Sequence, residues 1–136
     1  MNKYIVFALW VSFLFLTFVI GNYYRPFIYK NNIYDYGLAD VGYNSIAVVN
    51  MSLLSWLGFY KFTNSKFFDI LINTAVYLSL ELLSFFITLF GVFDAKDCYA
   101  LLFGCFLSFL LFYLLDKKLF MLEKETIFQI LKNKFN

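Results

Sequence analysis

The sequence predicts an all-α integral membrane protein in which four transmembrane helices form a small bundle. Of the 136 residues, 62% are hydrophobic and 15% are charged, whereas soluble domains average roughly 45–50% apolar and about 25% charged residues. The mean hydropathy is +0.74, and a chain this short cannot enclose so many apolar side chains in a core of its own in water. Four stretches also approach the roughly 20 apolar residues that an α-helix needs to cross a bilayer. The excess apolar surface must therefore face lipid or a partner.

The first two spans differ in their polar content. We predict the first at residues 4–21, which contain no charged side chain. This stretch is longer than the apolar region of a typical signal peptide, and no small-x-small cleavage site follows it, so a retained helix is expected. The second span is predicted at residues 46–62; it is shorter and carries Asn50, Ser52 and Ser55.

The last two spans are followed by an amphipathic tail. The third is predicted at residues 67–90 and contains Glu81, and the fourth is predicted at residues 98–115, where Asp116 ends the apolar run. In residues 116–136, lysines are interspersed with apolar residues. This tail is expected to lie along the inner membrane surface near anionic lipid, or to form a solvated tail or a docking surface for a neighbour.

The distribution of basic residues predicts the orientation. With four spans, one side of the membrane holds eight lysines, and the other holds only Arg25, Lys30 and Lys96. The positive-inside rule then places both termini in the cytoplasm, with the protein in the cytoplasmic (inner) membrane. The loop at residues 22–45 and the short turn at residues 91–96 are expected outside. The whole chain forms a single membrane domain.

The third span carries a polar stripe, in which polar residues recur every four positions. Because such residues share one helix face, and because an intramembrane carboxylate costs at least about 2.5–3.5 kcal/mol, this face must point to the bundle interior, a wet cavity or a partner subunit. Asp69 begins the stripe and is expected to be a helix-start or interface residue. The stripe comprises Asp69, Asn73, Tyr77 and Glu81, continued by Ser84 and Thr88.

Glu81 has two competing interpretations. It lies nine residues before Phe90, which places it roughly 13 Å below the predicted outer boundary and favours access from outside. The functional interpretation is a ligand, proton or head-group site. The structural interpretation is a carboxyl that fixes helix packing, with Asn50, Ser52 or Ser55 of the second span as its partner.

More charges gather at the predicted outer end. Asp94 and Asp97 flank Lys96 at the start of the fourth span, where either acid could cap the helix. Arg25 and Asp40 belong to the same predicted face, and Arg25 could pair with the acids or meet a phosphate. This collection of charges predicts an outward-facing polar pocket.

The fourth span also contains a face of small residues. Ala100, Gly104 and Ser108 recur every four positions, which permits close approach of another helix backbone, so we expect this face to pack. Cys98 and Cys105 are seven residues apart on the same helix, about 10 Å between Cα atoms, and cannot form a disulfide with each other.

Several enzyme classes lack their residues in this sequence. There is no histidine, there are only two cysteines, and neither a glycine-rich phosphate loop nor a Walker motif is present. Zinc hydrolysis, a Ser-His triad, haem ligation through histidine and ATP hydrolysis are therefore not predicted. We expect a non-enzymatic protein with no cofactor, no metal site and no nucleic-acid partner.

The acidic motifs resemble those of VanZ-like membrane proteins. Glu81-Leu-Leu-Ser84, then Gly91-Val-Phe-Asp94-Ala-Lys-Asp97 and then Gly104 resemble the family's core pattern. Asp40-Val-Gly-Tyr-Asn44 resembles its Asp-Lys-x-x-His element, with asparagine in the histidine position. The resemblance implies a small multi-span envelope protein, some relatives of which are linked to resistance to teicoplanin. Carried over position by position, the family residues are Asp40, Asn44, Glu81, Asp94, Asp97 and Gly104.

These observations lead to one main functional expectation. The protein is expected to bind an envelope or lipid-linked ligand in the outward-facing pocket. The alternatives are an accessory subunit that packs its polar stripe and small-residue face against a membrane-protein partner, and a small homo-oligomeric transporter. The expected partners are thus the bilayer, a lipid-linked molecule, and a membrane protein or a second copy. The predicted ligand-binding residues are Glu81, Asp94, Asp97, Arg25, Asp40, Asn44, Tyr77 and Asn73.

Overall fold

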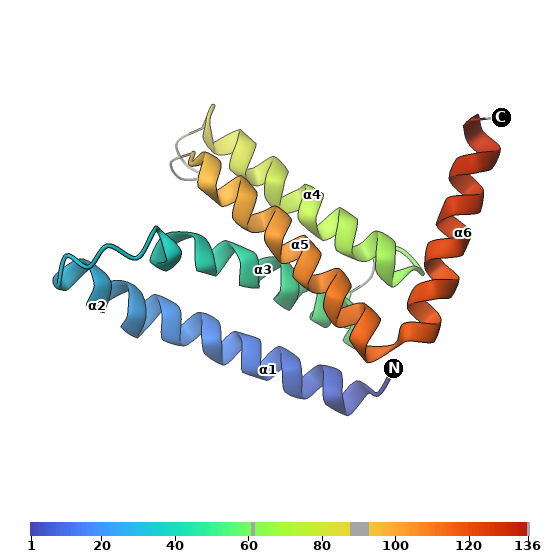
Figure 1. Cartoon of the computed structure of the whole chain (residues 1–136), viewed down its shortest axis with the longest axis horizontal. Helices are drawn as coiled ribbons and strands as arrows, with labels where there is room; N and C mark the ends of the chain where they lie inside the picture. Colours follow the sequence, from blue (N-terminus) through green and yellow to red (C-terminus); the bar gives the residue numbers. More distant parts are fainter. Residues whose placement is uncertain (61, 88–92, 136) are drawn as a thin grey trace.

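The computed structural model describes residues 1–60, 62–87 and 93–135, with side chains up to residue 126. Within these ranges every regular element is helical (Figure 1). A π-helical turn, η1, joins the first two α-helices without a break. The elements are α1 (Lys3–Val19), η1 (Ile20–Tyr24), α2 (Arg25–Lys30), α3 (Leu38–Leu57), α4 (Lys66–Ser84), α5 (Ala95–Leu115) and α6 (Lys117–Phe135).

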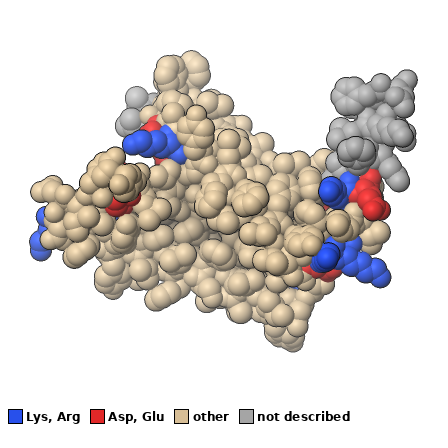
Figure 2. Space-filling view, in the orientation of Figure 1, with Lys and Arg blue, Asp and Glu red and all other residues tan. Residues whose placement is uncertain are grey.

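Three helices among the described residues are long and apolar enough to cross a membrane. They are the continuous run Lys3–Lys30, α4 and α5. On the face shown in Figure 2, charged side chains lie at the two ends of the molecule, and uncharged residues fill the band between them. Large apolar side chains of α1 and α5, such as Phe15 and Phe106, are more than half exposed. The all-α membrane class predicted from composition is therefore confirmed.

The central helix is α3, which packs against α1, α4 and α5 (Figure 1). It is not one of the three candidate spans, and half of its 20 residues are buried. The core joins α3 to its neighbours through the fully buried side chains of Val6, Val49, Leu53, Ile70 and Phe112. Because α3 is covered on several sides, its serines and Asn50 face protein rather than lipid.

The small-residue face of α5 packs closely against α3. A Cβ atom added at Gly104 would lie 2.3 Å from the backbone oxygen of Ser45. The Ser45 hydroxyl donates a hydrogen bond to the Ala100 carbonyl over 2.9 Å, and Ser108 is fully buried. The predicted close approach is confirmed, and its partner is a helix of the same chain. The accessory-subunit hypothesis expected this face to pack against another membrane protein. Because α3 already covers it, the face is not available for such a contact.

Several helix boundaries differ from the predicted spans because local capping fixes them. The second helix begins at Leu38 rather than residue 46 and ends at Leu57 rather than 62. Glycines in the left-handed region bracket it, with φ of +82° at Gly37 and +91° at Gly58, a conformation that glycine adopts at little cost. The first helix continues through η1 instead of ending at residue 21.

The helices on either side of the second connection also differ from the prediction. Helix α4 ends at Ser84 rather than residue 90, and residues 88–92 lie outside the described part, including Thr88 of the stripe. Helix α5 begins at Ala95 rather than residue 98 because Asp94 caps it. The Asp94 carboxylate accepts a hydrogen bond from the Lys96 N–H over 2.9 Å, which confirms the predicted cap.

The predicted tail is a helix, α6, that starts immediately after Asp116. The Asp116 carboxylate accepts the Leu119 N–H at 3.1 Å and forms an ion pair with the amino group of Met1 at 2.7 Å. Further along α6, the Glu123 carboxylate accepts hydrogen bonds from the Ser65 hydroxyl at 2.7 Å and the Phe67 N–H at 2.9 Å. The first part of α6 is thus docked on the end of the bundle where α4 begins.

Candidate functional site

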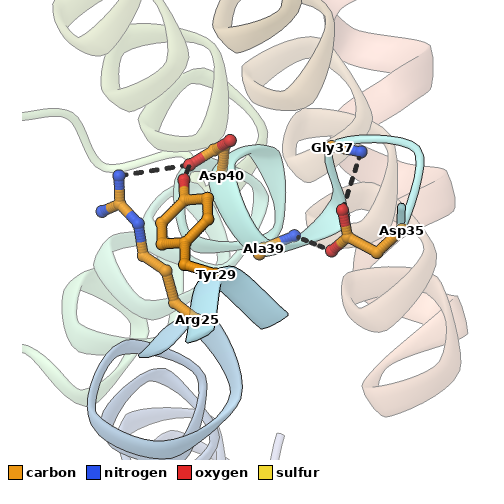
Figure 3. A network of polar contacts seen from close by, with 6 residues as sticks. All are labelled: Arg25, Tyr29, Asp35, Gly37, Ala39 and Asp40. Atoms are coloured by element: carbon orange, nitrogen blue, oxygen red, sulfur yellow. Dashed lines mark hydrogen bonds and ion pairs between the residues drawn. The ribbon is translucent and has the colours of Figure 1, made fainter. Parts of the chain in front are cut away.

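At one end of the bundle, which we call the open end, an ion pair connects α2 to the first turn of α3. A guanidinium nitrogen of Arg25 lies 3.1 Å from an Asp40 carboxylate oxygen, and the two side chains are 53% and 46% exposed. The Tyr29 hydroxyl donates to the same carboxylate (Figure 3), and the guanidinium lies 5.6 Å from the centre of the Tyr29 ring. The structure thus pairs Arg25 with Asp40, whereas the sequence analysis expected Glu81, Asp94 and Asp97 as its acidic partners.

The turn before α3 is built around Asp35, a residue that the sequence analysis missed. Its carboxylate accepts the Gly37 N–H at 3.0 Å and the Ala39 N–H at 2.6 Å (Figure 3). Desolvation alone would raise the pKa of Asp35, but the hydrogen bonds from Ala39 and Gly37 outweigh it and hold the pKa below its usual value. The signal was an aspartate two residues before a glycine at a helix start.

The predicted acids of α4 and α5 meet beside α3. A carboxylate oxygen of Glu81 accepts the Asp94 N–H over 3.1 Å. The Asp97 carboxyl lies beside the Asn44 amide, within the electrostatic influence of Glu81, Asp94 and Asp40. Three helices thus bring together side chains that are far apart in the sequence. We call Asp40, Asn44, Glu81, Asp94 and Asp97 the acidic cluster.

The position of Glu81 differs from the prediction. It lies in the last turn of α4, three residues before Ser84, and therefore about 5 Å from the end of this helix, which stops earlier than predicted. Phe90, from which the predicted depth was counted, lies outside the described residues. The packing partners expected for Glu81 are also wrong, because each of these side chains donates its hydrogen bond to another acceptor. Asn50 donates to Thr17, Ser52 donates to the Val48 carbonyl, and Ser55 donates to Asp69.

The rest of the polar stripe points into the bundle, as predicted. Asp69, Asn73 and Ser84 are buried, and Tyr77 and Glu81 are partly buried. Tyr77 lies within the electrostatic influence of Tyr43. Asn73, in contrast, belongs to the opposite end of the bundle and is not part of the acidic cluster.

At that opposite end, which we call the sealed end, Asp69 is 3% exposed. Its carboxylate accepts the Ser55 hydroxyl at 2.5 Å, the Thr63 N–H at 2.9 Å and the Thr63 hydroxyl at 3.1 Å. These contacts attach the end of α3 and the following loop to the first turn of α4. The prediction of Asp69 as a helix-start and interface residue is confirmed.

A tyrosine from the same loop completes the sealed end. Burial raises the pKa of Tyr60 to about 12, so its hydroxyl stays protonated at neutral pH. The hydroxyl lies 2.7 Å from the Met51 carbonyl oxygen and 2.8 Å from Oδ1 of Asn73. One hydroxyl proton serves only one of these acceptors, and Nδ2 of Asn73 has no partner among the described residues. Exchanging the amide oxygen and nitrogen gives Tyr60 one donor and one acceptor.

The open end also contains two neighbouring cavities that the sequence analysis did not predict. The first is an apolar groove of about 710 Å³ between η1, α3 and α5. Its floor includes Gly42, where an added Cβ would meet only Ile20, at 3.9 Å. The π-helical turn contributes Ile20 and Tyr24 to the wall, and such turns are frequent at functional sites. Val41, Phe103 and Leu107 line the rest of the groove.

The second cavity is a polar cleft of about 380 Å³ beside α2 and the turn before α3. Tyr29, Asn32, Asp35 and Asp40 contribute to its lining. Lys96, from the first turn of α5, lines both this cleft and the apolar groove. The two cavities therefore meet at one lysine, and together they offer an apolar compartment next to a polar one.

Comparisons with known proteins found no match: no family model, no curated protein and no solved structure is significantly similar to this chain. The VanZ-like resemblance therefore rests only on the short motifs around Asp40, Glu81 and Asp94.

Proposed function

We propose that this protein is a four-helix integral membrane protein that binds a lipid-linked molecule, with the hydrocarbon chain in the apolar groove and the head group in the polar cleft. The observation that carries this proposal is the meeting of the two cavities at Lys96. The groove volume of about 710 Å³ falls within the roughly 300–1,000 Å³ of small-molecule sites. A ligand that fits both compartments has to be amphipathic.

The four-span topology follows from treating α3 as a span. Its 20 residues are about 30 Å long, which equals the thickness of a hydrocarbon core. Burial of its polar side chains against three neighbouring helices removes the cost of placing them in lipid. The lysine-rich sealed end then faces the cytoplasm of the inner membrane, with both termini inside. The open end, with its groove and cleft, faces outward.

The acidic cluster adjoins this site, because Asp40 lines the polar cleft and Glu81 contacts Asp94 at the same end of the bundle. We propose that Glu81, Asp94 and Asp97 form the polar rim that a VanZ-like protein would present to an envelope molecule. Glu81 is partly buried, and within the described ranges its carboxylate accepts one hydrogen bond, from the Asp94 N–H, which leaves carboxylate oxygen available for a ligand. We favour a binding role over an enzymatic one, because acids without a histidine, a metal or an identified nucleophile do not make a hydrolase.

The groove can be tested by filling it. In Gly42→Leu the added side chain would extend from the floor into the apolar groove, whereas in Gly21→Leu it would enter open space, because nothing lies within 4 Å of the added Cβ. We expect lipid that co-purifies with the wild-type protein in mild detergent, measured by native mass spectrometry, to remain in Gly21→Leu and to be lost in Gly42→Leu. Equal lipid content in the two leucine variants would contradict the proposal.

Two further observations make this experiment decisive. Thermal melting of both variants, followed by circular dichroism, separates loss of lipid from loss of fold. If Gly42→Leu does not fold, Val41→Phe fills the same groove from a neighbouring wall position. A stoichiometric protein partner on a lipid-free wild-type chain would instead support the accessory-subunit hypothesis.

A further inference from the structure

We infer that the lipid-linked molecule carries an anionic head group, and that a phosphate or similar oxyanion at the junction of chain and head group contacts the Lys96 ammonium. This inference rests on the proposed function and names the chemical class of its ligand. In an amphipathic lipid, the phosphate lies where the hydrocarbon chain meets the polar head. Lys96 occupies the corresponding position in the protein, because it lines both the apolar groove and the polar cleft.

The geometry of α5 directs Lys96 and the neighbouring Asp97 to different surroundings. Consecutive residues of an α-helix point about 100° apart, so Lys96 and Asp97 face different neighbours. Asp97 lies beside Asn44, whereas Nζ of Lys96 lies 3.9 Å from the position that a Cβ of Gly37 would occupy. The ammonium thus extends over the start of α3, at van der Waals distance from that position.

The charges around the junction also favour an anion at Lys96. It is the only basic residue that lines either cavity within the described part of the chain. Neither ion pair in the described ranges involves Lys96, whereas Arg25 is already paired with Asp40. Of the acids in the cleft, Asp40 is balanced by this pair, and Asp35 is engaged by backbone N–H groups. The charge of Lys96 is therefore the one that a ligand can neutralise.

A cationic head group without a phosphate fits the junction less well. Its charge would have to pass the Lys96 ammonium to reach the cleft, and like charges at this distance repel. A lysine ammonium binds phosphate as a point charge with three donors, and such charge-assisted contacts contribute more than neutral hydrogen bonds. The occupant that satisfies both compartments is accordingly a phospholipid-like or polyisoprenyl-phosphate-like molecule.

The test compares two lipids with identical acyl chains, phosphatidic acid and diacylglycerol, titrated into the detergent-solubilised protein and followed by native mass spectrometry. The wild-type protein should bind phosphatidic acid about tenfold more tightly than diacylglycerol. Lys96→Gln should abolish this preference, and Lys96→Arg should restore it. Lys30→Gln is the matched control, because Lys30 ends α2 at the same end of the bundle and lines neither cavity.

Different failures identify different errors. If the wild-type protein shows no preference, or if Lys96→Gln retains it, the head-group inference is wrong while the groove proposal stands. If Gly42→Leu binds both lipids as tightly as the wild-type protein does, the proposed function itself fails. Inorganic phosphate is the third probe: binding that depends on Lys96 but is unaffected by Gly42→Leu would mean a soluble phosphate ligand, and it would overturn the commitment to a lipid.

Discussion

The two ends of the bundle use the same residue types in different ways. At the sealed end, Asp69 is 3% exposed, and its carboxylate accepts three hydrogen bonds from Ser55 and Thr63. At the open end, Arg25 and Asp40 form a pair whose side chains are about half exposed. A buried, fully bonded carboxylate is costly to disturb, whereas an exposed pair adds little to stability. The acids of the sealed end therefore hold the fold, and those of the open end remain accessible to a ligand.

The neighbourhood of each end leads to the same conclusion. Helix α6 covers the sealed end, where Glu123 accepts hydrogen bonds from the start of α4. The open end is instead hollowed by the apolar groove and the polar cleft. The polarity of a membrane helix thus does not by itself identify a binding site; the space next to the polar groups does.

The largest expected effect is at Asp69. Asp69→Ala should lower the free energy of unfolding by about 3 kcal/mol, because it leaves the Ser55 hydroxyl and the Thr63 N–H buried without an acceptor. Unfolding in sodium dodecyl sulfate, followed by circular dichroism, measures the change. The control at the open end is Glu81→Gln, which keeps an acceptor for the Asp94 N–H and should change the same quantity by less than about 0.5 kcal/mol. Equal losses in the two variants would remove the distinction between the ends.

The contact between α3 and α5 comes next. Gly104→Ala places a Cβ atom 2.3 Å from the Ser45 carbonyl oxygen, so the two helices must move apart, at a cost of about 2 kcal/mol. Because Ser45 and Ala100 also line the groove, lipid binding should weaken while the Asp69 network remains intact. Hydrogen exchange followed by mass spectrometry would locate the change. Loss of protection only around Asp69 would contradict this expectation.

A smaller effect is expected where α6 docks. Glu123→Ala removes the acceptor for the Phe67 N–H and the Ser65 hydroxyl, which should cost about 1 kcal/mol, as for other helix caps. Proteolysis of α6 should accelerate, whereas lipid binding at the open end should not change. Glu123→Gln retains one acceptor oxygen and is expected to lie between the wild-type protein and the alanine variant. A lipid-binding defect in either variant would mean that the two ends are coupled.

The smallest effect is expected at Asp35, where it depends on pH. The pKa of Asp35 is lower in the folded protein than its usual value. Its stabilising contribution is therefore present above the usual aspartate pKa and is lost as the pH falls through the lowered pKa. Asp35→Ala should lower the melting temperature at neutral pH, and this difference should shrink on acidification. In Asp35→Asn, which keeps the acceptor, no such convergence is expected from this residue. A constant difference between Asp35→Ala and the wild-type protein at every pH would contradict the role of the charge.

Much of the fold follows from local patterns. The apolar runs predicted the three candidate membrane helices. The four-residue period of Asp69, Asn73, Tyr77 and Glu81 predicted which face of α4 points into the bundle. The small residues around Gly104 predicted a close helix contact. These features depend on composition and helical periodicity, which are properties of short segments and need no knowledge of the neighbours.

Other features depend on residues far apart in the sequence. The groove exists because η1, α3 and α5 meet around Gly42, and no pattern in any one of these segments indicates a hollow. The docking of Glu123 on Ser65 likewise joins α6 to the start of α4, and the whole of α5 lies between these two helices in the chain. The sequence analysis expected a loop over residues 22–45, and it therefore did not predict that the turn around Asp35 starts α3 at Leu38.

The sequence by itself therefore determined that this is a helical membrane protein and which side chains must avoid lipid, because the cost of exposing them depends only on their chemistry. The tertiary structure alone decided which acids became fixed supports and which remained at the edge of a cavity. Asp69 and Glu81 occupy the same face of one helix, but Asp69 meets donors from α3 and its loop, and Glu81 lies at the open end. Burial depends on which helices meet around each carboxylate, and that is a property of the whole bundle.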